Sequence, residues 1–116
     1  MIIMVTGATA GFGESITRRF VANGHKVIAT GRREERLKTL KDDLGDNLYI
    51  AQLDVRNRAA IETLIADLPA EWQAIDVLVN NAGLMKRIPM IEMSHTDFMR
   101  VIDVHVGGAF NCSKAV

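Results

Sequence analysis

The sequence predicts an α/β fold, in which a doubly wound parallel sheet carries helices on both of its faces. Short apolar segments rich in β-branched residues alternate with amphipathic segments of helical period, and this alternation repeats four times along the chain. The 116 residues fit a single domain. Crossovers between parallel strands are right-handed, which limits the possible windings. The strand order that we expect is 3-2-1-4, numbered along the chain.

The first half of the chain contains three expected strands and two expected helices. Short apolar runs predict strands over residues 2–6, 26–30 and 47–53. Helical spacing of apolar residues predicts helices over residues 12–23 and 34–44, and a glycine follows each of them.

The second half continues the same alternation. Apolar residues at helical spacing over residues 61–68 predict a helix that Pro69 ends, and a strand is expected over residues 75–79. A polar, methionine-rich connection over residues 80–93 follows. Ser94 then begins the last helix, with Asp97 placed to complete a capping box. One face of this helix is expected to carry Phe98, Val101, Ile102, His105 and Ala109.

Composition excludes several classes of function. Lys and Arg total 14 and Asp and Glu total 14, a balance that argues against nucleic acid or membrane partners. No apolar run approaches the roughly 20 residues that span a bilayer, and no leader is recognised. Cys112 is the single cysteine, so we expect no intrachain disulfide and a cytoplasmic location. The three histidines are not paired with other ligands, so no metal site is expected.

A glycine-rich segment connects the first expected strand to the first expected helix. Glycine permits the tight turn and the close backbone approach that a phosphate needs, and the helix start supplies free N–H groups and partial positive charge. This position predicts a dinucleotide pyrophosphate site, whereas the alternative is that the glycines only make a tight turn. The candidate residues are Gly7, Ala8, Thr9, Ala10, Gly11, Phe12 and Gly13.

Two arginines follow the second expected strand. In this fold, the end of that strand meets the adenosine ribose, where an acidic residue would hold the 2′-hydroxyl. Arg32 and Arg33 occupy this place instead, and guanidinium groups bind phosphate through paired charge-assisted hydrogen bonds. The sequence therefore predicts NADP rather than NAD as the cofactor. The alternative is a solvated helix start, in which these arginines pair with Glu34 and Glu35.

Three motifs at strand ends resemble those of the classical short-chain dehydrogenases/reductases, whose fold is of Rossmann type. They are the glycine loop from Thr6 to Gly13, the segment Leu53-Asp54-Val55, and the segment Asn80-Asn81-Ala82-Gly83. Residues 1–84 are especially similar to the bacterial NADP-dependent 3-hydroxy acid dehydrogenases. Residues 85–116 resemble the family more generally, which leaves a hybrid gene as an alternative.

The resemblance implies a role for each matching segment. The residues from Gly7 to Phe12 would wrap the pyrophosphate, and the arginine pair would hold the 2′-phosphate. Asp54 would accept a hydrogen bond from the adenine amino group, with the Val55 backbone beside it. The cofactor ribose and the central strands would be supported by Asn81, Ala82 and Gly83.

The chain departs from the family pattern at the residues that perform the chemistry. The family uses a tyrosine with a lysine four residues later, but the only tyrosine here is Tyr49 and the residue four later is Leu53. We therefore expect no catalytic residue in this chain. His105 stands where the family usually has asparagine, and both a proton shuttle and a histidine with local hydrogen bonds remain open for it.

The last helix has no stop signal up to Val116, so we expect a sequence truncated after the fourth strand and its helix. On this interpretation, residues 1–116 form an incomplete NADP-binding Rossmann domain without the carboxy-terminal catalytic half. The complete oxidoreductase would exchange hydride with a hydroxy or keto compound such as a 3-hydroxy acid. The chain alone is expected to be inactive and to form homo-oligomers through its last helix. The alternatives are a non-catalytic NADP(H)-binding module and an oligomerising fragment.

Overall fold

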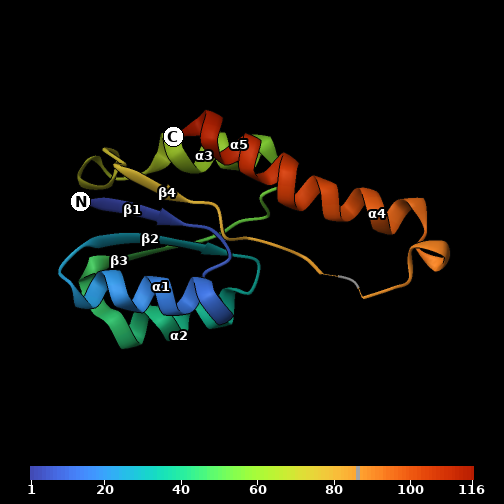
Figure 1. Cartoon of the computed structure of the whole chain (residues 1–116). Helices are drawn as coiled ribbons and strands as arrows, with labels where there is room; N and C mark the ends of the chain where they lie inside the picture. Colours follow the sequence, from blue (N-terminus) through green and yellow to red (C-terminus); the bar gives the residue numbers. More distant parts are fainter. Residues whose placement is uncertain (86) are drawn as a thin grey trace.

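Four parallel strands form the centre of the molecule. The structure is a computed structural model, and it describes residues 1–85 and 87–116. The sheet has the order β3-β2-β1-β4, so the predicted order is confirmed (Figure 1). The strands are β1 (Ile2–Val5), β2 (Lys26–Gly31), β3 (Leu48–Gln52) and β4 (Val77–Val79). The fourth strand is two residues shorter at its start than the apolar run suggested, because pairing with β1 begins at Val77.

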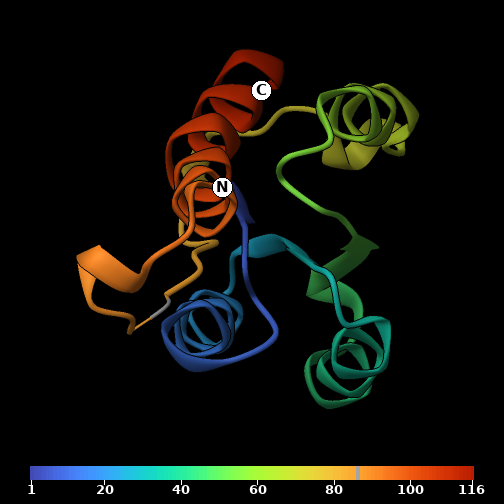
Figure 2. The ribbon, with the colours of Figure 1, turned by 90° about the vertical axis from the view of Figure 1, so that its right-hand side faces the viewer.

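Helices cover both faces of the sheet (Figure 2). One layer contains α1 (Gly11–Ala22) and α2 (Glu34–Leu44), and the other contains α3 (Arg58–Asp67) and α5 (Gly108–Ala115). Helix α4 (His95–Ile102) extends away from the sheet and runs into α5 through the π-helical turn η4 (Asp103–Gly107) (Figure 1). Three short 3₁₀ helices complete the structure: η1 (Gly45–Asn47), η2 (Ala70–Trp72) and η3 (Met90–Glu92).

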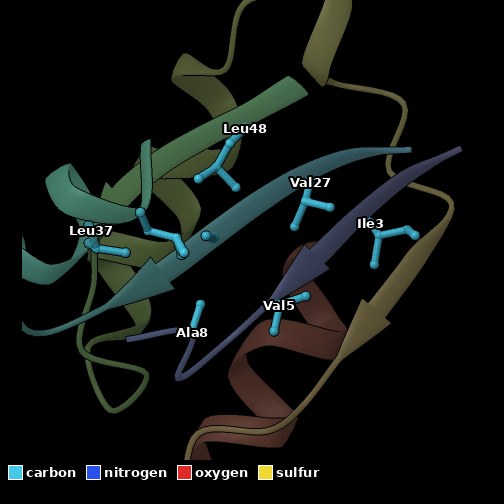
Figure 3. Packing of buried hydrophobic residues seen from close by; sticks show 8 residues of the cluster. Ile3, Val5, Ala8, Val27, Leu37 and Leu48 are labelled. Carbon is cyan, nitrogen blue, oxygen red and sulfur yellow. The ribbon is translucent and has the colours of Figure 1, made fainter. Parts of the chain in front are cut away.

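Alternation along the strands divides the core between the two faces. Successive side chains of a strand point to opposite sides, so Ile3 and Val5 pack toward α1 and α2 while Met4 packs toward α3 and α5. Figure 3 shows the first of these clusters, in which Val27 and Leu48 join Ile3 and Val5. Both faces are apolar, which explains why the strands appear in the sequence as continuous apolar runs.

The expected face of the last helical segment is only partly covered, since Phe98 is 51% exposed while Val101, Ile102 and Ala109 are half-buried. Val104, Cys112 and Ala115 pack on the sheet. The π-helical turn adds a residue to one turn and so rotates every side chain that follows it about the axis. The predicted cap is present, because the Ser94 side chain accepts a hydrogen bond from the Asp97 N–H at 3.0 Å.

Within the described ranges 1–85 and 87–116, no helix has the length and apolar character needed to cross a membrane.

Two neighbouring glycines offer a matched test of how α5 packs on the sheet. A Cβ on Gly108 would lie 2.5 Å from Val55 Cγ2, whereas a Cβ on Gly107 would meet nothing within 4 Å. We expect Gly108→Ala to lower the free energy of unfolding by about 1–3 kcal/mol through overpacking. Gly107→Ala should raise it by about 0.5–1 kcal/mol, since alanine costs less backbone entropy in a helix. Urea unfolding followed by circular dichroism measures both, and equal effects would contradict the packing.

Candidate functional site

A cavity of about 600 Å³ opens at the carboxyl ends of the strands. Ligands of open α/β sheets bind at this edge, where the strand order reverses between neighbouring crossovers. The loops after all four strands contribute to the wall. The described residues that line it are Gly7, Thr9, Ala10, Gly31, Arg32, Arg33, Leu53, Asp54, Val55, Asn81, Ala82, Gly83, Leu84 and Val104.

Hydrogen bonds tie the glycine loop to the segment after β4. Asn81 Nδ2 donates to the carbonyl oxygens of Thr6 and Gly7, each at 3.1 Å. In return, Thr6 Oγ1 accepts from the backbone N–H groups of Asn81 at 3.1 Å and Ala82 at 3.0 Å. These side chains therefore hold the loop against the sheet.

Glycine is required where the loop turns and where it meets α1. Gly7 has φ +66°, a conformation that L side chains rarely adopt, and a Cβ there would lie 2.8 Å from Ala82 Cα. A Cβ on Gly13 would collide with the Gly7 carbonyl oxygen and with Asn81 Nδ2. The spacing of these glycines therefore follows from the close approach of strand, loop and helix.

The first turn of α1 begins without a side-chain cap. Ala10 is the N-cap residue and has no side-chain oxygen that could accept from the following N–H groups. Uncapped N–H groups at a helix start carry partial positive charge and favour an anion. Since Ala10 also lines the cavity, this helix start is placed to receive an anionic group.

The arginine pair lies on the wall of the cavity beside Thr9. Arg33 donates from its guanidinium to Thr9 Oγ1 at 3.1 Å, and Gln52 Nε2 donates to the Arg32 carbonyl oxygen at 3.0 Å. Gly31 permits this contact between loops, since a Cβ there would lie 2.5 Å from Thr9 Cγ2. Glu34 forms an ion pair with Lys38 rather than with either arginine, so the alternative of a solvated pair with Glu34 finds no support here.

Asp54 lines the cavity from the loop after β3 as a charged acceptor. Arg56 contacts both of its oxygens, with 3.0 Å from Nε to Oδ1 and 2.7 Å from the terminal NH2 group to Oδ2. The hydrogen bond from Arg56 lowers the pKa of Asp54 to about 2. The Asp54 carboxylate is therefore ionised across the neutral range and accepts hydrogen bonds without donating any.

His105 lies in the π-helical turn and contacts the loop after β4. Its Nε2 lies 3.0 Å from the Leu84 nitrogen and 2.8 Å from the Leu84 carbonyl oxygen. An unprotonated Nε2 accepts from the N–H, whereas a protonated Nε2 donates to the carbonyl. The imidazole also packs on Gly83, where a Cβ would lie 2.8 Å from its Cε1. His105 therefore connects the π-helical turn to the loop after β4, 21 residues earlier in the chain.

The structure brings together most, but not all, of the residues singled out from the sequence. The exceptions among the described residues are Ala8, Gly11, Phe12 and Gly13, which do not line the cavity. Phe12 is 85% exposed, and Gly13 acts through packing beneath the loop. Sequence reasoning missed Gly31, Leu53, Leu84 and Val104 as cavity residues. Gly31 could have been predicted as a cavity residue, because it is a glycine at the end of a strand directly before Arg32 and Arg33.

The cavity wall is suited to binding rather than to covalent chemistry. Its ionisable side chains, among the residues described, are Arg32, Arg33 and Asp54. Tyr49 lies in β3 and its ring packs against Trp72 at 5.6 Å between ring centroids. Outside position 86, no group of three or more His, Cys, Asp or Glu side chains could hold a metal ion.

Comparison with known proteins identifies related sequences over the whole chain. The family model described as short chain dehydrogenase matches residues 1–116. The chain is 64% identical over 117 residues to the NADP-dependent 3-hydroxy acid dehydrogenase YdfG of Escherichia coli K12, covering 100% of this chain and 47% of that protein. It is 42% identical over 110 residues to the serine 3-dehydrogenase of Agrobacterium fabrum, covering 94% of this chain and 44% of that protein. The chain thus spans about half the length of these relatives.

Solved structures agree with the sequence comparison. The serine dehydrogenase from Escherichia coli matches with a TM-score of 0.96 and 64% identity, over 100% of this chain and 54% of that chain. A closed form of serine dehydrogenase complexed with NADP+ also gives a TM-score of 0.96 and 64% identity, over 100% of this chain and 47% of that one. With a family model that matches it from end to end, the chain belongs to the short chain dehydrogenase family.

Proposed function

We propose that residues 1–116 form the NADP-binding domain of an oxidoreductase that transfers hydride between NADP(H) and a hydroxy or keto compound such as a 3-hydroxy acid. The catalytic half would lie outside this chain, which has no Tyr-x-x-x-Lys pair. The observation that carries the proposal is the cavity at the strand ends, where an uncapped helix start, two arginines and one ionised carboxylate face the same space.

The glycine loop fits a pyrophosphate. Gly7 lines the cavity, and the lack of side chains at Gly7 and Gly13 lets the loop and the start of α1 pack closely against the segment after β4. The uncapped first turn of α1 supplies N–H donors, which compensate phosphate charge. Asn81 would keep this loop in place beneath the dinucleotide.

The arginine pair supports NADP over NAD. A 2′-phosphate adds negative charge at the end of β2, where Arg32 and Arg33 both line the cavity. Among the described lining residues, the loop after β2 contributes no acidic side chain. The one acidic lining residue, Asp54, belongs to the loop after β3. When bound, NADPH would supply the hydride, while these side chains bind and orient its adenosine end.

The relatives support the same assignment of cofactor and substrate class. Both YdfG of Escherichia coli and the serine 3-dehydrogenase of Agrobacterium fabrum are named for dehydrogenase activity on small hydroxy compounds. One solved relative is a complex with NADP+. Since the chain covers about half of these proteins, the activity itself is proposed for the complete protein.

A second candidate function is association through the last helical segment. Phe98, Val106 and Phe110 are 51%, 61% and 58% exposed, which leaves apolar side chains of α4, η4 and α5 uncovered. We propose that the complete protein forms homo-oligomers through this segment. Sedimentation of a monodisperse monomer would contradict the association.

The reading frame beyond Val116 separates an enzyme from a non-catalytic NADP(H)-binding module. If it continues into a Tyr-x-x-x-Lys segment, the enzyme assignment is supported. If it continues without one, the domain would bind the nucleotide without turning it over.

Nucleotide binding is tested by thermal unfolding with each dinucleotide. A ligand that binds only the folded state adds about 2.7 kcal/mol to the free energy of unfolding when its concentration is one hundred times its Kd. We expect NADPH to raise the melting temperature and NADH to raise it much less at the same concentration. Equal shifts would contradict the preference for NADP, and no shift with either nucleotide would leave only the association.

The arginine pair is tested by neutral substitutions with a matched control. Arg32→Gln and Arg33→Gln should each weaken NADPH binding about tenfold and leave NADH binding nearly unchanged, since each removes charge-assisted bonds to phosphate. Arg36→Gln removes the same charge from an exposed position of α2 that does not line the cavity. Fluorescence titration measures all three, and an equal loss in Arg36→Gln would indicate a general charge effect instead.

A further inference from the structure

An arginine outside the cavity controls the acceptor inside it. Asp54 lines the cavity, whereas Arg56 is not among the described residues that do. The Arg56 guanidinium binds both carboxylate oxygens side by side, and the Arg56 backbone N–H donates to Asp54 Oδ1 at 3.0 Å. Three donors from one residue therefore hold a single carboxylate, two residues earlier in the chain.

These contacts leave little acceptor capacity. An ionised carboxylate has about four lone-pair sites on its two oxygens. Oδ1 accepts from the backbone N–H and from Nε of Arg56, each at 3.0 Å. Oδ2 accepts from the terminal NH2 group at 2.7 Å and has a longer contact of 3.2 Å with Nε, which it shares with Oδ1. The less tightly held acceptor site is therefore on Oδ2.

The neighbouring backbone acceptor is occupied from the other side. Asn111 Nδ2 of α5 donates to the Val55 carbonyl oxygen at 3.0 Å, and Gly108 lets α5 approach the Val55 side chain. The segment Asp54–Val55 is therefore fixed from two directions. The side-chain acceptor that this segment presents to the cavity is the Asp54 carboxylate, which cannot donate because its charge persists at neutral pH.

We propose that Arg56 is a positioning residue that makes the site selective for a 6-amino purine over a 6-oxo purine, by holding the Asp54 carboxylate as an oriented, pure acceptor. The inference rests on the proposed NADP function. A 6-amino group donates to the carboxylate, whereas a 6-oxo group presents its own lone pairs to it and is repelled. Without Arg56, the carboxylate can rotate and take water, and the two bases become more alike.

The pair matters for selectivity more than for stability. Both side chains are about one-third exposed, at 35% for Arg56 and 33% for Asp54, and exposed ion pairs add little to folding. A base seated against Asp54 excludes water from the carboxylate, and a mismatched group then leaves a desolvated charge unpaired. Loss of Arg56 should consequently change base preference while leaving the fold intact.

The test compares NADPH with reduced nicotinamide hypoxanthine dinucleotide phosphate, which differs by a 6-oxo group in place of the 6-amino group. We expect the unmodified chain to bind NADPH about tenfold more tightly, the worth of one hydrogen bond to a charged group. In Arg56→Gln, this ratio should fall severalfold. Arg56→Lys keeps the positive charge but loses the planar guanidinium with its paired N–H donors, so it should restore the ratio only in part. Affinities are measured by fluorescence titration, with circular dichroism to confirm folding.

Arg58→Gln provides the matched control. Arg58 lies two residues after Arg56, at the first position of α3, and it carries the same charge. Its side chain is 65% exposed and forms a 3.9 Å ion pair with Glu62. The ratio should not change in this variant. Asp54→Asn should itself abolish the preference, since an amide both donates and accepts, and adding Arg56→Gln to it should then have no further effect.

The outcomes separate this inference from the function on which it rests. Binding of NADPH with no base preference, or a preference that Arg56→Gln leaves intact, overturns the role of Arg56 alone. An effect of Arg56→Gln that persists in the Asp54→Asn background also overturns it, because Arg56 would then act directly on the nucleotide. Failure of both dinucleotides to bind overturns the proposed function and the inference together.

Discussion

The ends of β1 and β4 are joined where the chain turns out of the sheet, and the rest of the site is arranged around this junction. The Thr6 hydroxyl accepts two N–H groups from the segment after β4, and the Asn81 carboxamide donates to two carbonyl oxygens of the glycine loop. Such a network leaves no space for a Cβ on Gly7 or Gly13. The loop is thereby satisfied on its inner side, and the uncapped start of α1 remains available on its outer side.

The sequence predicted the parts of the structure that depend on local patterns. Continuous apolar runs indicated strands buried on both faces, and the range of α2 agrees with its expected bounds of 34–44. The order of the strands agrees with the Rossmann-type winding that the family resemblance implied, and right-handed crossovers are compatible with it. The glycine loop, Arg32, Arg33 and Asp54 were found because each follows directly after a strand, and parallel strands end at one edge of the sheet.

The features that escaped prediction depend on contacts between distant segments. The π-helical turn was not predicted from the sequence, and Val104 within this turn reaches the cavity. The contact of His105 with Leu84 joins residues 21 apart, and that of Asn111 with Val55 joins residues 56 apart. Arg56 is near Asp54 in sequence, but only its side-chain geometry shows that it holds the carboxylate.

The backbone groups and the charged side chains of the cavity depend on the fold to different degrees. The glycine loop offers main-chain groups whose positions are fixed by packing, so a change there would disturb the fold together with the cavity. Arg32, Arg33 and Arg56 are exposed and contribute little to the core, so they can change without loss of the sheet. If the cavity binds a dinucleotide as proposed, its selectivity can therefore vary independently of the fold, because these charges lie outside the packing that holds the strands together.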